Sequence, residues 1–547
     1  MRPKLLLAAL ALALVAAVGC TKISSSVNSG NAVNAWTVHG VLRIGSYEDL
    51  DHLNPLLSNQ LFVSDVAQML FSGLIDYDDH GNPIPDVALS FPTRQNGGVS
   101  EDGKTVTYHL RHGVLFSDGA PLTSADVKFT WQQIMNPANN VAVRYPYDDV
   151  DTIDTPDPYT VILRLKAPLA FLVATFMRNG TTSAILPKHL LDKYSDLNKV
   201  AFNTNPVGSG PFIVDKWQPG VQLELRANPR YWRGAPKLRR VVYRIIPDQN
   251  TLLTSVRSHD VDFYFDAPET QYALLKATPG VRVTAVPNQN FEHIEFNCRR
   301  PPLDDVRVRQ AIAFAIDWKQ LADKVYQGID TPGIADTPPT SWAYDPSVKP
   351  YPYDPVKARA LLAQAGWSPG RDGILQKDGR TFRIGITTVT GITTRAKVEE
   401  FIQAELKDVG IALDIRNYHA NILFATYGFN GVLARGKFDL SLFAWSYTVP
   451  DPDDTQTIGP DQIPPTGTNY TFLDDPVIGK AQEGGRVNYD RATRRRYYVT
   501  IQHRVHDVMP RHTIVWRVNI DAVNTDMKNF KPAPAVSDFW NSYEWQI

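Results

Sequence analysis

A stretch late in the chain holds residues whose types and spacing could do chemistry. Residues 445–454 read WSYTVPDPDD: a Trp and a Tyr end an apolar run, and three aspartates set among prolines follow. Such carboxylates could bind a metal ion, act as a catalytic acid and base, or line one wall of a pocket. The rest of the chain decides between these three possibilities.

The sequence argues against a metal loop in this stretch. Read from Asp451, the segment superficially resembles a calcium-binding loop. However, Thr455 occupies the fifth position and Gln456 occupies the position of the required glycine. The prolines beside Asp451 predict a rigid turn instead. No group of Cys and His residues has zinc-binding spacing, so we predict no metal site.

Motifs of enzymes and cofactor-binding proteins are missing from the sequence. Gly208 and Gly210 lack the third glycine of a dinucleotide-binding loop, and no phosphate-binding loop, nucleophile elbow or zinc-protease motif occurs. The acidic pair Asp304 and Asp305 precedes a helical pattern, where capping and the helix dipole explain it. The sequence therefore predicts neither catalysis nor a cofactor.

The composition is that of a large globular protein. The chain has 547 residues, of which 43% are hydrophobic and 21% charged, with a formal net charge of −1. This length predicts two or three domains. Without a basic excess, nucleic acid is not an expected partner.

The N-terminus has the pattern of an export signal. Arg2 and Lys4 precede an unbroken apolar run over residues 5–18, which is too short for an ordinary membrane span. The following AVGC resembles the bacterial lipobox, in which the cysteine is acylated. We expect a signal peptide over 1–19, lipid on Cys20 and a flexible tether over 20–40. The alternative is a soluble secreted protein cut nearby.

The second cysteine has no disulfide partner if Cys20 carries lipid. Cys298 is the only other cysteine in the sequence, so an exported protein of this size must be held together by its core. We predict that Cys298 is a buried small hydrophobe rather than a nucleophile.

Strand and helix patterns alternate along the chain. Residues 104–110 and 159–166 alternate apolar and polar positions, as half-buried strands do. In the second half, Asp317 and Asp354 are predicted helix caps. A predicted strand over 437–445 leads into the aspartate-containing residues 445–454. This alternation predicts an α/β fold with sheets covered by helices.

Several segments, in order, resemble one protein family. They are SEDGKTVTYHLRHGVLFSDGAPLTSADVKFTWQQIMNP (100–137), NPVGSGPFIVDKW, RANPRYWRGAPKL, IEFNCRRPPLDDVRVRQAIAFAID, YDPVKARALLAQAGW and FDLSLFAW with PDPDD. Together they resemble the family 5 extracellular solute-binding proteins of ABC importers, which include oligopeptide- and dipeptide-binding proteins. The resemblance runs from about residue 41 to the C-terminus.

The resemblance implies a periplasmic-binding-protein-like fold of class II with three lobes and a hinge-linked ligand cleft. Two chain crossings between the first and third lobes would form the hinge, and a ligand touching both would favour the closed state. The expected boundaries are 41–75, 203–287 and 507–547 for lobe I, 76–202 for lobe II, and 288–506 for lobe III.

The resemblance also implies which residues line the cleft. Trp445 matches a cleft Trp of peptide-binding relatives, and His419 stands near the place of a second one. Thr448 replaces the Asp that pairs with the free amine of a bound peptide. PLLSNQLF aligns with a short strand whose backbone pairs with the peptide. The expected ligand-binding residues are Asn59, Leu61, His419, Trp445, Ser446, Tyr447 and Thr448.

The function implied is solute capture without chemistry. The protein would be a monomeric lipoprotein in the periplasmic space or at the outer face of the cytoplasmic membrane, and it would hand a peptide to ABC permease subunits. Because Thr448 carries no charge, an oligosaccharide or another ligand without a free amine is the first alternative. An exported hydrolase and a receptor that signals to a membrane partner are the others.

Overall fold

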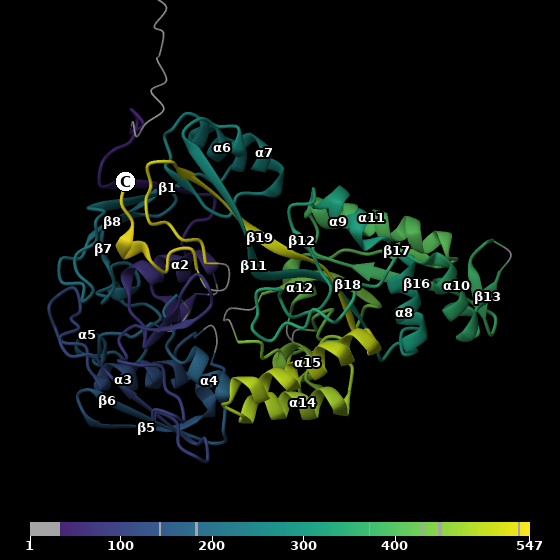
Figure 1. Ribbon diagram of the computed structural model, residues 1–547, viewed down its shortest axis with the longest axis horizontal. Coiled ribbons are helices and arrows are strands. Elements are labelled where there is room, and N and C mark those ends of the chain that lie inside the picture. Colours follow the sequence, from purple (N-terminus) through teal and green to yellow (C-terminus); the bar gives the residue numbers. More distant parts are fainter. Residues whose placement is uncertain are drawn as a thin grey trace, which may run out of the picture. The chain divides into compact units, whose positions relative to one another are not determined.

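The computed structural model describes residues 33–547 except 59, 142–143, 181–183, 371, 426, 429, 447–450 and 534–536. The chain divides into two units, Met1–Thr37 and Val38–Ile547. The described residues of the first unit form a turn in which the Thr37 N–H donates to the Asn34 carbonyl at 3.0 Å. Everything below concerns the second unit (Figure 1).

One large mixed sheet organises this unit. Its strands follow the order β17-β16-β18-β11-β19-β10-β1-β9-β8-β7, with β12 paired to β19. Their bounds are β17 (Ala412–Ile415), β16 (Arg383–Thr387), β18 (Leu440–Ser446), β11 (Val281–Phe296), β19 (Arg511–Asn524), β10 (Phe263–Tyr264), β1 (Val41–Ser46), β9 (Arg240–Ile245), β8 (Gln222–Ala227), β7 (Phe212–Gln218) and β12 (Thr331–Pro332).

Two long antiparallel strands cross the middle of this sheet. β11 and β19 pair from Val281 opposite Asn524 to Glu295 opposite Arg511. The register shifts between Pro287 and Phe291, so the two ends of the pair are not one continuous ladder. β18 continues the sheet on the β11 side (Figure 1), and β10 pairs with β19 on the other side.

Smaller sheets complete the strand inventory. β4 (Thr105–His109), β6 (Thr160–Leu165) and β5 (Val150–Asp157) form an antiparallel sheet from the segment expected to be lobe II. The remaining strands are β2 (Ile75–Tyr77) with β3 (Pro83–Pro85), and β13 (Ser368–Pro369), β14 (Leu375–Lys377) and β15 (Arg380–Thr381).

Helices lie between the strands, as the sequence pattern predicts. In the first half they are α2 (Leu61–Leu70), α3 (Ser124–Met135), α4 (Ala170–Thr175), α5 (Lys188–Leu191), α6 (Gln249–Arg257) and α7 (Tyr272–Lys276). In the second half they are α8 (Val306–Ala315), α9 (Trp318–Val325), α10 (Pro355–Gln364), α11 (Thr393–Asp408), α12 (Ala420–Leu423), α13 (Thr455–Ile458), α14 (Pro476–Val487) and α15 (Arg491–Val508). None of the helices in the described part of the chain is both long and apolar enough to cross a bilayer.

Carboxylate caps begin several of these helices. Asp317 accepts a hydrogen bond from Gln320 N at 2.9 Å, and Asp354 accepts one from Lys357 N at 2.8 Å. Asp305, one of the acidic pair, caps α8 through Arg307 N at 2.9 Å. These bonds satisfy amides that have no partner within the helix, so the predicted caps are confirmed.

Both faces of the sheet around β18 are buried. Leu440 and Leu442 pack with α8, α10 and α11 on one face. Phe443 packs on the opposite face with Leu423, Tyr470 and neighbouring residues. A strand covered on both faces is held in register by its side chains. The end of β18 is therefore a rigid support for the residues that follow it.

The structure corrects one expectation in the first half of the chain. Leu61 was expected on a short strand, but it is the first residue of α2. The extended backbone ends at Gln60, which has φ −78° and ψ 131°. The apolar residues that follow repeat at helical spacing and bury Phe62, Val66 and Met69. That burial favours the helix over a strand.

Candidate ligand-binding site

The carboxyl ends of three parallel strands meet at one edge of the large sheet. β16 pairs in parallel with both β17 and β18. The residues that follow them are Tyr418 and His419 after β17, Thr388 after β16, and Trp445 and Ser446 at the end of β18. Side chains at the carboxyl ends of parallel strands are placed to meet a ligand. The structure thus brings together His419 and the end of β18, which lie far apart in the sequence.

Trp445 is the best-defined member of this edge. It is half-buried, and its ring stacks on Tyr470 with centroids 5.9 Å apart and an interplanar angle of 16°. Its indole N–H donates to Glu295 Oε1 at 3.1 Å, and Phe443 packs edge-on at 5.3 Å. These contacts fix the ring while leaving part of it accessible to a solute.

A buried carboxylate supports Trp445 from the neighbouring strand β11. Glu295 is fully buried, and His293 Nε2 lies 3.4 Å from its Oε1. Glu295 Oε2 has no hydrogen-bond partner among the described residues. Sequence reasoning did not select Glu295. The alternation in HIEF shows only that it lies on a strand, and not that Trp445 stands beside it.

His419 lies on the same edge, next to β16. It is exposed, and its Nδ1 lies 3.3 Å from Thr390 Oγ1. Its carbonyl accepts hydrogen bonds from Ile422 N and Leu423 N, so it begins the short helix α12.

An exposed apolar rim follows His419. Ile422, Phe424 and Tyr427 are large apolar side chains with 47%, 40% and 36% exposure. Phe424 packs edge-on against Phe443, with centroids 5.6 Å apart. This rim therefore adjoins the aromatic group that includes Trp445.

The structure describes only some of the other predicted site residues. Ser446 is exposed and pairs with Asn290, inside the register shift of β11. Asn59, Tyr447 and Thr448 lie outside the described residues, as does Cys20. Leu442, three residues before Trp445, is buried in the core.

Two aspartates of residues 445–454 form ion pairs with arginines of the same chain. Asp451 makes two hydrogen bonds to the Arg494 guanidinium, at 2.6 and 2.8 Å. Asp454 lies 3.3 Å from Arg511, which also pairs with Asp336 at 2.7 Å. Burial, together with the Asp336 charge, raises the pKa of Asp454 to about 7 despite the opposing Arg511. Asp451 and Asp454 are therefore bound within the protein, whereas the predicted rigid turn stays a prediction because Pro450 lies outside the described residues.

A network of ion pairs spans the crossing strands. Arg395 on α11 makes two hydrogen bonds, both 3.0 Å long, to Glu292 on β11. Arg517 on β19 lies 3.7 Å from Glu292 and 3.2 Å from Asp330, and it also pairs with Glu269. Desolvation by burial lowers the pKa of Arg517, but the three acids outweigh it, and the pKa is raised above its ordinary value. The Arg517 charge is thus shared among three carboxylates.

A pocket of about 200 Å³ is lined by none of the residues named above at the carboxyl edge of β16, β17 and β18. It is lined mainly by Tyr77, residues 91–95, residues 170–174, Trp342 and residues 489–494. Part of its charged lining is engaged within the protein, since Arg494 pairs with Asp451 and Arg94 lies over the Tyr489 ring at 5.3 Å. Arg491, which lies over the Trp342 ring at 5.0 Å, is a further cation of this lining.

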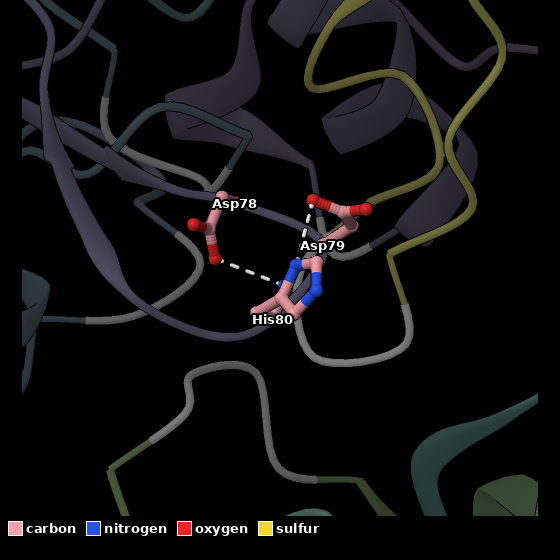
Figure 2. A group of neighbouring side chains, drawn as sticks. All are labelled: Asp78, Asp79 and His80. Atoms are coloured by element: carbon pink, nitrogen blue, oxygen red, sulfur yellow. Dashed lines mark hydrogen bonds and ion pairs between the residues drawn. The ribbon is translucent and has the colours of Figure 1, made fainter.

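In the described part of the chain, one group of side chains has metal-ligand chemistry. Asp78, Asp79 and His80 follow β2, and Figure 2 shows them around a tight turn. Asp78 Oδ1 accepts hydrogen bonds from His80 N at 2.9 Å and Asn82 N at 2.8 Å. This carboxylate closes the β2–β3 turn, and the turn by itself accounts for the acidic residues.

The lone thiol of the described chain is inert. Burial raises the pKa of Cys298 to about 12, and its Sγ contacts the Phe296 carbonyl at 3.5 Å. The thiolate is the nucleophilic form, so the raised pKa disfavours a nucleophilic role. Cys298 is half-buried against the core that includes Phe296 and Leu440, rather than fully buried as predicted.

Comparison with known proteins identifies the family. Residues 82–458 match the bacterial extracellular solute-binding proteins, family 5 Middle. The oligopeptide-binding protein AppA of Bacillus subtilis is 28% identical over 515 residues, which are 93% of this chain and 92% of that protein. The glutathione-binding protein GsiB of Escherichia coli O1:K1 is 31% identical over 376 residues, 69% of this chain and 68% of that protein.

Solved structures show the same fold. The structure of AppA in complex with a nonapeptide superposes with a TM-score of 0.75 at 26% identity, covering 92% of this chain and 98% of that one. NikZ from Campylobacter jejuni in complex with Ni(L-His) has a TM-score of 0.76 at 24% identity, covering 93% and 100%. The α/β periplasmic-binding-protein fold predicted from the sequence is confirmed.

These relatives are solute-binding proteins and not enzymes, which removes the hydrolase alternative. Proteins of this kind are extracytoplasmic, and they bind a solute and deliver it to a permease. The chain belongs to the family 5 extracellular solute-binding proteins of ABC importers.

Proposed function

We propose that this protein captures a peptide at the carboxyl edge of β16, β17 and β18 and delivers it to the permease of an ABC importer. The observation that carries this proposal is the position of Trp445. A partly exposed, rigidly held indole stands at the end of a buried strand, directly beside the register shift of β11. A solute in contact with Trp445 would also lie close to the crossing strands.

The crossing strands give the proposed hinge a physical basis. β11 and β19 are the pair that joins the two ends of the large sheet, and their ladder is interrupted between Pro287 and Phe291. Fewer regular backbone hydrogen bonds resist rotation at such a point. The segments 41–75, 203–287 and 507–547 would move as one lobe, with 76–202 attached, against 288–506. A solute that touches both sides would stabilise the closed form.

A peptide is favoured because the relatives AppA and GsiB are named for peptide ligands. The exposed rim of Ile422, Phe424 and Tyr427 could accommodate apolar side chains of a peptide. An oligosaccharide is the second candidate, since Trp445 and Tyr470 form an aromatic pair on which a sugar ring could stack. The lipid on Cys20 would keep the protein at the membrane beside its permease.

Native mass spectrometry of the protein as purified tests this proposal. We expect a retained solute of defined mass that leaves unchanged when the protein is denatured. Small-angle scattering should show compaction when the solute is added back to protein that has been stripped of it. Absence of compaction with any candidate solute, together with accumulation of a reaction product, would refute solute capture.

A further inference from the structure

The pocket of about 200 Å³ lies where two distant parts of the chain meet. One wall comes mainly from Tyr77, residues 91–95 and residues 170–174, and the other from Trp342 and residues 489–494. The helix α4, which contains 170–174, lies beside α14 (Figure 1). The proposed capture of a solute at the carboxyl edge of β16, β17 and β18 leaves this pocket unused.

Hydrogen bonds join the two parts of the chain beside the pocket. Tyr489 OH donates to the Gly103 carbonyl at 2.8 Å and accepts from Leu169 N at 3.1 Å. On the first wall, Tyr77 OH donates to the Ala174 carbonyl at 3.1 Å. A pocket whose walls are already fixed binds a ligand without first having to order them, which favours affinity for a small molecule.

Two exposed arginines of the lining have no acidic partner. Arg94 lies over the Tyr489 ring at 5.3 Å, and Arg491 lies over the Trp342 ring at 5.0 Å. Neither guanidinium has an ion pair or a hydrogen bond in the described part of the chain, which includes every Asp and Glu of the sequence. A single exposed arginine of this kind is common, but two that line the same pocket are placed to bind one anion together.

The other charged residues of the lining are engaged by the protein. Arg494 makes two hydrogen bonds to Asp451, at 2.6 and 2.8 Å. Asp490 caps α15 by accepting a hydrogen bond from Thr493 N at 2.8 Å. In all, three arginines and two aspartates line the pocket, so the lining carries one surplus positive charge. This surplus suits a ligand with a single negative charge.

The rest of the lining is largely aromatic and apolar. Phe91, Trp342 and Tyr489 are partly exposed, whereas Ala170 and Val173 are buried. Aromatic side chains of this kind offer faces and edges for a flat ring. The volume of about 200 Å³ equals roughly six or seven water molecules at about 30 Å³ each, and it is below the range of about 300–1,000 Å³ for drug-sized ligands. The pocket therefore has room for one ring with a short acidic substituent, and not for an oligopeptide.

We propose that this pocket, which we name the Arg94–Arg491 pocket, binds a small aromatic carboxylate. The carboxylate would accept hydrogen bonds from the Arg94 and Arg491 guanidinium groups, and the ring would pack against Trp342 or Tyr489. An inorganic anion would leave the aromatic lining unused, and a neutral aromatic molecule would leave both guanidinium groups without a partner. The protein would then hold two ligands of different class, one at this pocket and the transported solute elsewhere.

Calorimetry with three probes tests the inference on the purified protein. Phenylacetate carries a ring and a carboxylate, phenylacetamide is its uncharged match, and sulfate is an anion without a ring. Arg94→Gln and Arg491→Gln each remove one charge at an exposed position, and Arg491→Lys keeps the charge without the planar fork of donors. Arg496→Gln is the matched control, because Arg496 is an exposed arginine of α15 that does not line the pocket.

We expect one phenylacetate to bind per chain, at least tenfold more tightly than phenylacetamide or sulfate. Arg94→Gln and Arg491→Gln should each weaken phenylacetate binding at least fivefold, and Arg491→Lys should weaken it less than Arg491→Gln does. Arg496→Gln should bind phenylacetate as the wild type does. The comparison of the three probes uses wild-type protein alone, so it requires no variant to fold.

Four outcomes would overturn the inference. Equal affinity for phenylacetamide and phenylacetate would exclude recognition of the carboxylate, and equal affinity for sulfate would exclude recognition of the ring. If none of the probes binds, the pocket is not a site for this class of ligand. If phenylacetate loses affinity in Trp445→Phe and not in the two arginine variants, it occupies the carboxyl edge of β16, β17 and β18. In each case the proposed function stands, because compaction with the transported solute tests it separately.

Discussion

Arg494 holds Asp451 through two hydrogen bonds of 2.6 and 2.8 Å inside the protein. This pair shows what Asp451, the first aspartate of residues 445–454, does in the structure. Asp451 stabilises a buried guanidinium, which also bonds to Gly485 O and Tyr498 OH. It is therefore part of the support of the site and not a free carboxylate for a ligand.

Replacing Asp451 with Ala should destabilise the protein by about 3 kcal/mol, because a buried Arg494 charge would lose its partner. Urea denaturation followed by circular dichroism measures this loss. Asp461→Ala removes an exposed carboxylate from the same segment, and it should change the free energy of unfolding by less than about 0.5 kcal/mol. Equal effects of the two changes would contradict the assignment.

Replacing Trp445 with Phe should lower affinity for the retained solute by about 1–2 kcal/mol, since part of the stacking surface is lost. The same change removes the N–H that bonds to Glu295. The solute-induced change in tryptophan fluorescence should disappear. Trp540→Phe is the matched control, because Trp540 is also half-buried with a bonded indole N–H. A fluorescence change that survives in W445F would place the solute elsewhere.

Introducing a charge at position 448 should strengthen binding of a peptide with a free amine. Thr448→Asp would restore the negative charge that the family resemblance implies at this position, and a desolvated ammonium gains from a nearby anion. We expect the affinity for trialanine to be preserved or increased, and that for N-acetyl-trialanine to be unchanged. Thr466→Asp, at an exposed position, should affect neither. If peptide binding does not respond to position 448, the alignment of that residue is wrong.

The stability of the unliganded protein should fall as the pH rises through 8. Desolvation, reinforced by Asp538, Asp266 and Glu48, raises the pKa of Asp65 to about 8. A carboxyl with a raised pKa binds its proton more tightly in the folded state. Its stabilising effect is complete below about pH 4, the unfolded value, and is lost as the pH approaches 8.

Asp65→Asn should remove this dependence. The variant should gain stability relative to wild type between pH 5 and pH 9, by about 1–3 kcal/mol. Thermal denaturation at several pH values measures the difference. Asp79→Asn should follow the wild-type curve. A constant difference between D65N and wild type over this range would mean that Asp65 titrates normally.

Changing Cys20 to Ser should release the protein from the membrane. Without the thiol no acyl chain can be attached, and a lipid anchor supplies about 0.8 kcal/mol for each buried CH₂. Fractionation of cells and intact-mass measurement check this. Cys298→Ser is the control, because that thiol packs against the core of the folded protein. Equal membrane association of the two variants would argue against lipidation of Cys20.

Local patterns in the sequence predicted the strand that carries Trp445 and the residues that cap two helices. Helical and strand periodicity placed the end of β18, and short-range chemistry identified the caps Asp317 and Asp354. Each of these features depends on residues within a few positions of one another, where spacing along the chain sets spacing in space.

Only the tertiary structure decided the rest. Nothing near Trp445 in the sequence indicates Glu295, which lies 150 residues earlier and meets the indole through the β11–β18 pairing. The strand that the family resemblance implied at Leu61 is the start of a helix, because the apolar residues that follow repeat at helical spacing and are buried. Only the fold brings the charges of Asp266 and Asp538 close to Asp65, which lies far earlier in the sequence. The sequence by itself determined the family and the local elements, and long-range packing determined which side chains face one another.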